Sequence, residues 1–161
     1  RAPASLQGQF EAPFGPMGPP TLFTLPVLRY MKNYGMSHEQ LAMVAVVQRE
    51  WASKNPRASF QDLITVDDVL ESKLIAYPFH LLECCLVTDG GGALILTLNN
   101  RAKDFPQKPV FILGCGESVE TPMISQMEDL TSSRAFRVAG PAAMQQAGVK
   151  HSDVDLSLIH I

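Results

Sequence analysis

Residues 81–98 read LLECCLVTDGGGALILTL and carry the clearest fold signal in the chain. Their last five positions, residues 94–98, form an almost continuous apolar run of strand length, which predicts a strand buried on both faces. Three glycines, residues 90–92, precede this run. We expect them to let the strand pack closely against a helix, in preference to cradling a phosphate. Residues 110–114 predict a second strand after a short charged link.

The chain beyond this second strand predicts one helix and one further strand. Thr131 is the expected N-cap of the helix, and Gly148 lies just past its expected end. Small and apolar residues recur on one side of it: Phe136, Ala139, Ala143 and Ala147. Residues 155–159 read as the last strand, so the second half of the chain is predicted to be mixed α/β.

The first eighty residues predict helices and loops instead. Residues 1–20 are rich in proline and glycine and predict a loop. A helix should follow, capped by Thr21 or Thr24 and ending at Gly35. Pro26 favours the later start, because proline is tolerated only in a first turn.

Two capping signatures mark the next helices. Ser37, with a glutamine three residues later, matches a capping box, and residues 55–56, Asn-Pro, predict the end of that helix. Apolar residues at helical spacing indicate its core-facing side: Leu41, Val44, Val47 and Trp51. Thr65, followed by an apolar residue and two aspartates, predicts a short third helix with its acids at the positive end of the helix dipole.

The bulk composition excludes several classes of protein. The chain has 161 residues, of which 46% are hydrophobic and 18% charged, and its formal net charge is -3. This composition predicts about one folded domain. Because no basic block stands out and the apolar runs are short, we expect neither a nucleic-acid partner nor a transmembrane segment. The three cysteines have neither disulfide nor zinc spacing, so no metal site is predicted.

Segments spread along the chain match one family in that family's own order. Residues 89–96 run Asp-Gly and small residues into a buried strand, and residues 78–85, PFHLLECC, form the approach to it. Other matching segments are residues 10–15, 29–35, 41–58, 64–70, 110–117 and 147–155. The ordered set resembles the thiolase superfamily, and within it the sterol-carrier or lipid-transfer type. That branch usually has an arginine where His80 stands here, which puts any salt bridge of that arginine in doubt.

The resemblance implies an α/β fold, as a fragment of the thiolase α/β/α/β/α sandwich with a helical loop-domain portion followed by mixed α/β. Residues 1–80 would be part of the loop domain. Residues 81–108 would hold the last strand of the N-terminal half and a linker, and residues 109–161 the truncated start of the C-terminal half. The implied activity is that of an acyl-CoA thiolase or acyltransferase acting on 3-ketoacyl-CoA or steroid-type acyl-CoA thioesters. Coenzyme A would then be a substrate, with no permanently bound cofactor.

The resemblance implies that the family's catalytic residues fall outside this sequence. The first residue is Arg1 rather than methionine, and we expect the nucleophilic cysteine upstream of it and the catalytic histidine downstream of Ile161. We therefore expect the fragment itself to be inactive, and to be of low stability because strand edges stay unpaired. His160 falls at an oxyanion-hole histidine of the branch, but Ile161 replaces the expected aspartate. The other interpretation is that residues 157–161 result from truncation or sequence assembly.

Two positions of the opening stretch correspond to residues that line the pantetheine path in the biosynthetic branch. A serine and a glycine stand there in that branch, and Cys85 and Leu86 stand there in this chain, without the hydroxyl or the glycine. Cys84 and Cys85 precede a strand rather than a helix N-terminus, so we expect buried structural cysteines and not nucleophiles. The nearest candidates for the phosphates of coenzyme A are Arg29, Lys32 and Arg49, although a solvated helix face explains them equally well.

Three other interpretations stay open. The chain could be a noncatalytic thiolase-like acyl-CoA or lipid-binding subunit, or a stand-alone α/β interaction module. A dinucleotide-binding oxidoreductase is disfavoured, because residues 114–116, Gly-Cys-Gly, lack the further glycine and the downstream acid of that fingerprint. For the full-length protein we expect a homodimer or hetero-oligomer, in the cytoplasm if bacterial and in peroxisomes if eukaryotic.

Overall fold

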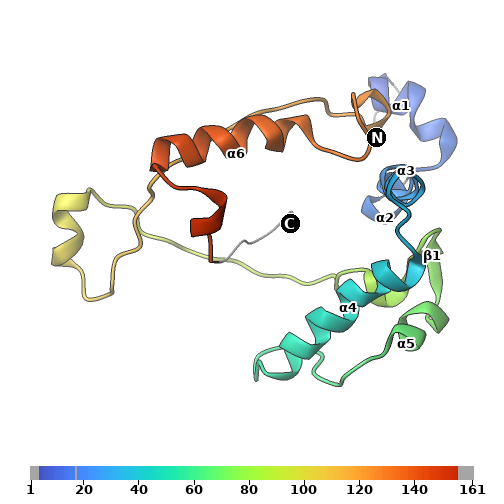
Figure 1. Cartoon of the computed structure of the whole chain (residues 1–161), viewed down its shortest axis with the longest axis horizontal. Coiled ribbons are helices and arrows are strands. Elements are labelled where there is room, and N and C mark those ends of the chain that lie inside the picture. The colour runs from blue at the N-terminus through green and yellow to red at the C-terminus, as the bar shows by residue number, and fades with distance from the viewer. Residues whose placement is uncertain (1–3, 17, 156–161) are drawn as a thin grey trace. The chain divides into compact units, whose positions relative to one another are not determined.

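The computed structural model describes residues 4–16 and 18–155 (Figure 1). The chain divides into two compact units. The first unit consists of residues 1–87 and 121–132, and the second of residues 88–120 and 133–161. The first unit holds α1 (Leu6–Phe10), η1 (Ala12–Phe14), α2 (Pro19–Leu22), α3 (Thr24–Tyr34), α4 (His38–Ser53), α5 (Val66–Glu71), β1 (Leu74–Ala76), β2 (Phe79–His80), η2 (Leu81–Glu83) and η4 (Ile124–Gln126). The second holds η3 (Asn99–Asp104), α6 (Arg134–Ala147) and η5 (His151–Asp153).

Both capping signatures of the first unit are confirmed. Ser37 Oγ accepts from Gln40 N at 3.3 Å, and Gln40 Oε1 accepts from Ser37 N at 2.9 Å, so α4 begins with a complete capping box. Thr65 Oγ1 accepts from Asp68 N at 3.1 Å, and the Asp68 carboxylate accepts from Thr65 N at 2.8 Å. These bonds join residues three positions apart, which is why a short sequence pattern predicts them.

The N-terminal segment contains more helix than its proline and glycine content predicts. α3 starts at Thr24, as Pro26 favours, and ends at Gly35, whose φ of 68° lies in the left-handed region. The predicted cap is wrong, because the N-cap is Phe23, which makes no side-chain capping hydrogen bond, and neither Thr21 nor Thr24 takes that place. The loop predicted for residues 1–20 is wrong in part, because α1 lies within it. Ser5 Oγ accepts from Gly8 N at 3.0 Å and caps that helix, while proline at its first position starts α2.

α6 lies where a helix is predicted, with one correction at its start. Ser133, not Thr131, is the N-cap, and its side chain accepts from Phe136 N. Thr131 instead closes a turn, donating its N–H and hydroxyl to the Asp129 carboxylate at 2.8 and 2.7 Å. The predicted end is confirmed, since Gly148 follows the helix with a φ of 69°.

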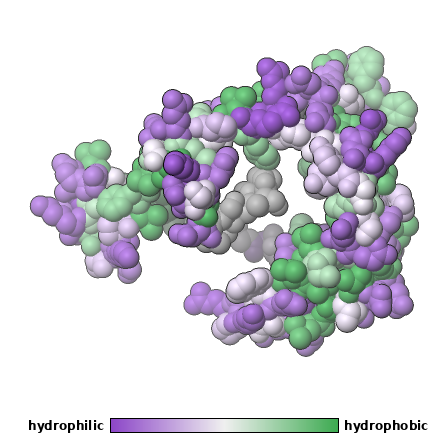
Figure 2. Space-filling model, in the orientation of Figure 1, coloured by the Kyte–Doolittle hydropathy of each residue, from purple (hydrophilic) through white to green (hydrophobic). Residues whose placement is uncertain are grey.

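The core of the first unit is small. α5 packs against α4, and among the described residues of this unit the buried apolar ones are Ala42, Val69, Pro78 and Met123. Trp51 was expected in the core but is 68% exposed, and Val44 and Val47 on the same expected core-facing side are 56% and 42% exposed. Figure 2 shows hydrophobic colour at the surface over α4. The reason is that the contacts of α4 are with α5 and η2, and the Trp51 ring packs with Lys54, whose Nζ lies 4.6 Å from the ring centroid.

The long apolar runs of the second unit are extended but unpaired within the described part of the chain. Residues 94–98 and 110–114 join no sheet there, so neither predicted strand is paired. Ile95 is 81% exposed, so the burial on both faces predicted for residues 94–98 is wrong for this structure, and Val110 is 95% exposed. A strand is stable only with a hydrogen-bonded neighbour. The observed sheet is the hairpin of β1 and β2, paired Leu74 with His80 and Ala76 with Phe79. The strand predicted at residues 155–159 lies outside the described residues apart from Asp155.

A close approach of an extended segment to a helix does occur, but at other glycines than those expected. A side-chain carbon at any of residues 90–92 would meet no atom within 4 Å. At Gly116 it would overlap the carbonyl oxygen of Ala139, and at Gly114 that of Ala143. The segment between residues 114 and 116 therefore lies directly on the backbone of α6, and Cys115 N donates to Gln146 Oε1 at 2.7 Å. The domain boundaries at residues 80 and 108 stay a prediction.

Candidate functional site

The two predicted pantetheine positions follow η2 at the edge of a small cleft. This cleft, of about 300 Å³, lies between α4 and η2, and Cys85 is one of its lining residues. Leu86 is not part of the lining and is half exposed. The structure thus brings Cys85 to a cleft and leaves Leu86 beside it, and the role of both positions stays a prediction. His160 lies outside the described residues.

The neighbouring cysteines differ in environment. Cys84 is half-buried and its thiol donates to the carbonyl oxygen of His80 at 3.5 Å. Burial raises the pKa of the Cys84 thiol, and the adjacent Glu83 and Cys85 raise that pKa further. A thiol in its protonated form is a poor nucleophile, so the structural role expected for Cys84 agrees with its surroundings. Cys85 is exposed, and the expectation that it is buried is wrong.

His80 keeps an acidic neighbour despite replacing the branch's arginine. Glu83 Oε2 accepts from His80 N at 2.6 Å and lies 3.4 Å from His80 Nδ1. The two side chains are 17% and 7% exposed, so the pair is largely shielded from water. An ion pair between them forms only when the imidazole is protonated, whereas an arginine would be charged at all physiological pH values.

The three candidate cations for the phosphates of coenzyme A are not gathered into one site. The Arg49 guanidinium donates to the carbonyl oxygen of Asp62 at 3.0 Å and lies 5.4 Å from the centroid of the Phe60 ring. These contacts give Arg49 a structural role on α4. Arg29 and Lys32 lie exposed on a different helix, α3.

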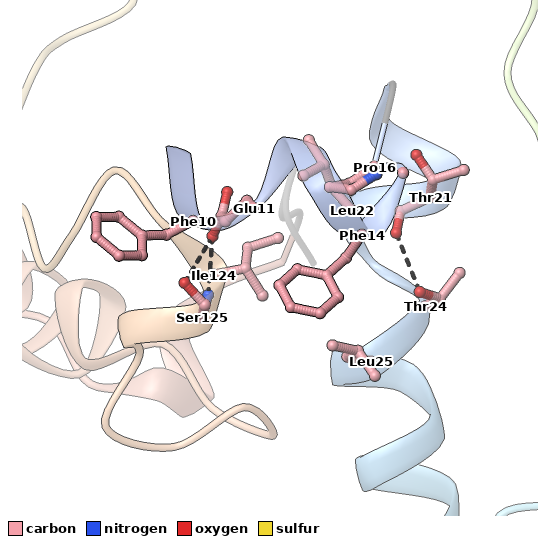
Figure 3. A pocket seen from close by; sticks show the side chains of 11 residues that line it. Phe10, Glu11, Phe14, Pro16, Thr21, Leu22, Thr24, Leu25, Ile124 and Ser125 are labelled. Carbon is pink, nitrogen blue, oxygen red and sulfur yellow. Dashed lines mark hydrogen bonds between the residues drawn. The ribbon is translucent and has the colours of Figure 1, made fainter. Parts of the chain in front are cut away.

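The larger cavity of the first unit was not found from the sequence. We call it the Phe14 pocket; eleven residues line its volume of about 640 Å³ (Figure 3). Most of its wall is apolar and comes from α1, η1, α2, α3 and η4: Phe10, Phe14, Leu22, Leu25 and Ile124. Figure 3 shows the Phe14 ring projecting toward Leu25 at the start of α3. The lining combines residues 10–25 with residues 124–125, which no local sequence pattern connects.

One buried acid joins these two segments at the pocket wall. Glu11 is 7% exposed, and its Oε1 accepts from Ser125 N at 3.1 Å and from Ser125 Oγ at 2.8 Å. In the sequence, the one indication that Glu11 could matter was its position within residues 10–15, a segment that matches the family. Its partner, 114 positions away in the chain, could not be inferred from that segment.

The described residues contain neither a cluster of potential metal ligands nor a membrane-spanning helix. Among residues 4–16 and 18–155, no three His, Cys, Asp or Glu side chains gather so as to hold a metal ion. No helix in the same ranges is both long and apolar enough to cross a membrane.

Comparison with known proteins identifies the family. Residues 116–160 match the family described as thiolase C-terminal domain-like. The acetyl-CoA acetyltransferase of Methanocaldococcus jannaschii is 36% identical over 154 residues, covering 94% of this chain and 39% of that enzyme. The 17-hydroxy-3-oxo-4-pregnene-20-carboxyl-CoA lyase of Mycobacterium tuberculosis is 30% identical over 160 residues, covering 96% of this chain and 42% of the lyase.

Two further comparisons define the branch. Sterol carrier protein 2 of Gallus gallus is 25% identical over 146 residues, which cover 88% of this chain and 27% of that protein. A chain of the solved Ltp2-ChsH2(DUF35) aldolase superposes with a TM-score of 0.81 at 34% identity, covering 89% of this chain and 39% of that chain. The chain therefore spans well under half the length of the relatives it matches. It belongs to the thiolase superfamily, in the sterol-carrier and lipid-transfer branch, and has the fold of part of the thiolase sandwich.

Proposed function

We propose that this chain is part of an acyl-CoA thiolase or acyltransferase that acts on 3-ketoacyl-CoA or steroid-type acyl-CoA thioesters. The observation that carries the proposal is the near-complete coverage of this chain by relatives named for coenzyme A thioesters. One is an acetyl-CoA acetyltransferase, matched over 94% of the chain, and another is a pregnene-carboxyl-CoA lyase, matched over 96%. Coenzyme A would enter as a substrate.

The unpaired strands support a role as one part of a larger sandwich. Residues 94–98 and 110–113 are apolar, extended and exposed, and an apolar surface of this kind is stable in water only when another element covers it. The relatives have more than half their length beyond the matched region. In the proposed full-length protein, strands from that remainder pair with these segments.

We expect the covalent chemistry of a thiolase to come from residues outside the described part of this chain. Acyl transfer in this family needs a cysteine thiolate, and the raised pKa of Cys84 opposes thiolate formation. We therefore expect the chain by itself to catalyse no thiolysis of acetoacetyl-CoA. The nucleophile and the catalytic histidine would lie in the remainder of the full-length protein.

The test is to determine the full coding sequence, express the whole protein and incubate it with acetyl-CoA. Intact-mass spectrometry should show a gain of one acetyl group with release of coenzyme A, and thiolysis of acetoacetyl-CoA by added coenzyme A should form two molecules of acetyl-CoA. Replacing the upstream cysteine by serine should abolish both, while Cys84→Ser should keep the acetyl adduct. An acetyl adduct located on Cys84 would overturn the assignment of the nucleophile to another segment.

A second candidate is a noncatalytic thiolase-like acyl-CoA or lipid-binding subunit. It is favoured by one observation, that the similar solved structure is named as an aldolase of two components, Ltp2 and ChsH2. Such a subunit would work in a hetero-oligomer, whereas the first candidate also allows a homodimer. Binding of acyl-CoA with no covalent adduct, by a protein that copurifies with a second polypeptide, would select this alternative.

A further inference from the structure

We propose that the Phe14 pocket binds the neutral, apolar acyl portion of the substrate and excludes the anionic nucleotide end of coenzyme A. The inference rests on the proposed function and deepens it, since it names the part of the thioester that one cavity accepts. The experiment distinguishes an error in the role given to the pocket from an error in the proposed function.

The size and lining of the pocket suit an apolar ligand. Its volume of about 640 Å³ lies within the range of small-molecule sites. The five large side chains of its wall are three aliphatic residues and two phenylalanines, and of these Phe14 is 87% exposed. A ligand with an apolar body would remove much of this surface from water, which is favourable.

The charge of the lining opposes an anion. Among the eleven lining residues there is no lysine, arginine or histidine, and the one ionisable group is the buried carboxyl of Glu11. Phosphate groups are held by cationic side chains or by several donors. A phosphate placed here would instead face an acid, so the nucleotide end of coenzyme A does not fit this wall.

The hydroxyl groups of the lining are already used as donors (Figure 3). Ser125 Oγ donates to Glu11, and Thr24 Oγ1 donates to the carbonyl oxygen of Thr21 at 3.0 Å. Thr21 Oγ1 donates to the carbonyl oxygen of Gly18 at 2.9 Å. Each hydroxyl has one hydrogen, so these three groups can offer a ligand only lone pairs. The side chains of the wall therefore suit a neutral ligand that carries a hydroxyl donor, and disfavour a carboxylate or phosphate.

The experiment uses the full-length protein and two matched leucine variants. Leu25 is 62% exposed in the pocket, and Leu63 is 69% exposed outside its lining, so Leu25→Trp fills the pocket and Leu63→Trp is the control. Dissociation constants are measured by calorimetry for coenzyme A, dodecanoyl-CoA and an analogue with a carboxylate at the far end of the chain. Dodecanoyl-CoA should bind the parent protein about tenfold more tightly than coenzyme A, as burial of several methylene groups implies.

Leu25→Trp should remove this advantage, Leu63→Trp should keep it, and the terminal carboxylate should weaken binding about tenfold in the parent protein. Phe14→Ala provides a second variant with the same expected loss, and its exposure means that truncation leaves the folded core intact. The inference would be overturned if both tryptophan variants lost the tighter binding of dodecanoyl-CoA to the same extent. It would also be overturned if the methyl-ended and carboxylate-ended chains bound equally well.

If the parent protein binds no coenzyme A derivative, the proposed function fails, and the pocket is then tested with dodecanol and dodecanoate. Preference for dodecanol that is lost in Leu25→Trp and kept in Leu63→Trp would uphold the pocket without the function. Binding of neither, or of dodecanoate as well as dodecanol, would reject the pocket too.

Discussion

The two units of the chain acquire their structure by different means. In the first, capped helices and a hairpin surround the buried residues Ala42, Val69 and Met123. In the second, one capped helix carries an extended segment on its backbone, while the apolar residues 94–98 stay exposed. A helix cap is completed by residues a few positions apart, whereas a strand needs a partner that is distant in sequence. The comparison implies that the first unit is nearer to self-sufficiency than the second.

The largest expected effect is in the second unit, at Gly116. Gly116→Ala would place a methyl group against the carbonyl oxygen of Ala139, so the extended segment must move off α6. We expect the free energy of unfolding to fall by about 3 kcal/mol, at the upper end of the range for overpacking. Urea unfolding followed by circular dichroism measures it.

Gly91→Ala is the matched control, because a side-chain carbon there meets no atom within 4 Å. It should change the free energy of unfolding by less than about 0.5 kcal/mol. Equal effects at the two glycines would show that the contact with α6 does not stabilise the second unit.

The next effect is in the core of the first unit. Val69→Ala removes two methyl groups from a side chain that is 0% exposed, between α5 and its neighbours. The lost burial and the remaining cavity should lower the free energy of unfolding by about 2 kcal/mol. A chemical denaturation curve with an unchanged midpoint would mean that this small core does not hold the unit together.

A smaller effect is expected at the cap of α5. Thr65→Ala should cost about 1 kcal/mol of stability through loss of the N-cap, while Thr65→Ser should cost little. The Thr65 hydroxyl and N–H also lower the pKa of Asp68 from its ordinary value of 3.8. The ionised Asp68 therefore contributes to the free energy of unfolding. This contribution is complete above pH 3.8 and is lost as the pH falls through the lower pKa of the folded state.

In Thr65→Ala the pKa of Asp68 should rise toward its ordinary value, as followed by NMR titration of its carboxyl carbon. An unaltered titration would mean that the backbone N–H of residue 65 alone determines this pKa.

The smallest effect, and the sharpest test of the comparison, is at Val110. Since Val110 is 95% exposed, Val110→Ala in this chain should change the free energy of unfolding by less than about 0.5 kcal/mol. In the proposed complete sandwich the same substitution should cost about 2 kcal/mol, because the side chain becomes buried. Similar small values in both proteins would mean that the remainder of the protein does not cover this strand.

The sequence-based predictions succeeded where contacts are local and failed where they join residues distant in sequence. Ser37, Thr65 and Gly148 were predicted correctly at helix ends, because each makes its contacts within its own turn. Trp51 was misplaced because helical spacing defines a face of α4 but not what covers it. The glycines of close approach were also misplaced, since only the positions of Ala139 and Ala143 distinguish residues 114–116 from residues 90–92.

The site was less predictable than the helices. The resemblance to the family singled out Cys85 and Leu86. The structure places Cys85 in the lining of a cleft, whereas Leu86 does not line it. The Phe14 pocket depends on the pairing of Glu11 with Ser125, and neither residue carries a local signature of that contact. Long-range polar pairs of this kind become visible only in three dimensions.

The contact of residues 114–116 with α6 has a consequence for the evolution and recombination of such chains. The atoms that would obstruct a side chain at either glycine belong chiefly to the backbone of the helix, namely the carbonyl oxygens of Ala139 and Ala143. Shortening a helix side chain cannot remove a carbonyl oxygen, so no second-site suppressor among the α6 side chains can make room. Grafting the extended segment between homologues should therefore succeed only when the segment and α6 are exchanged as one block.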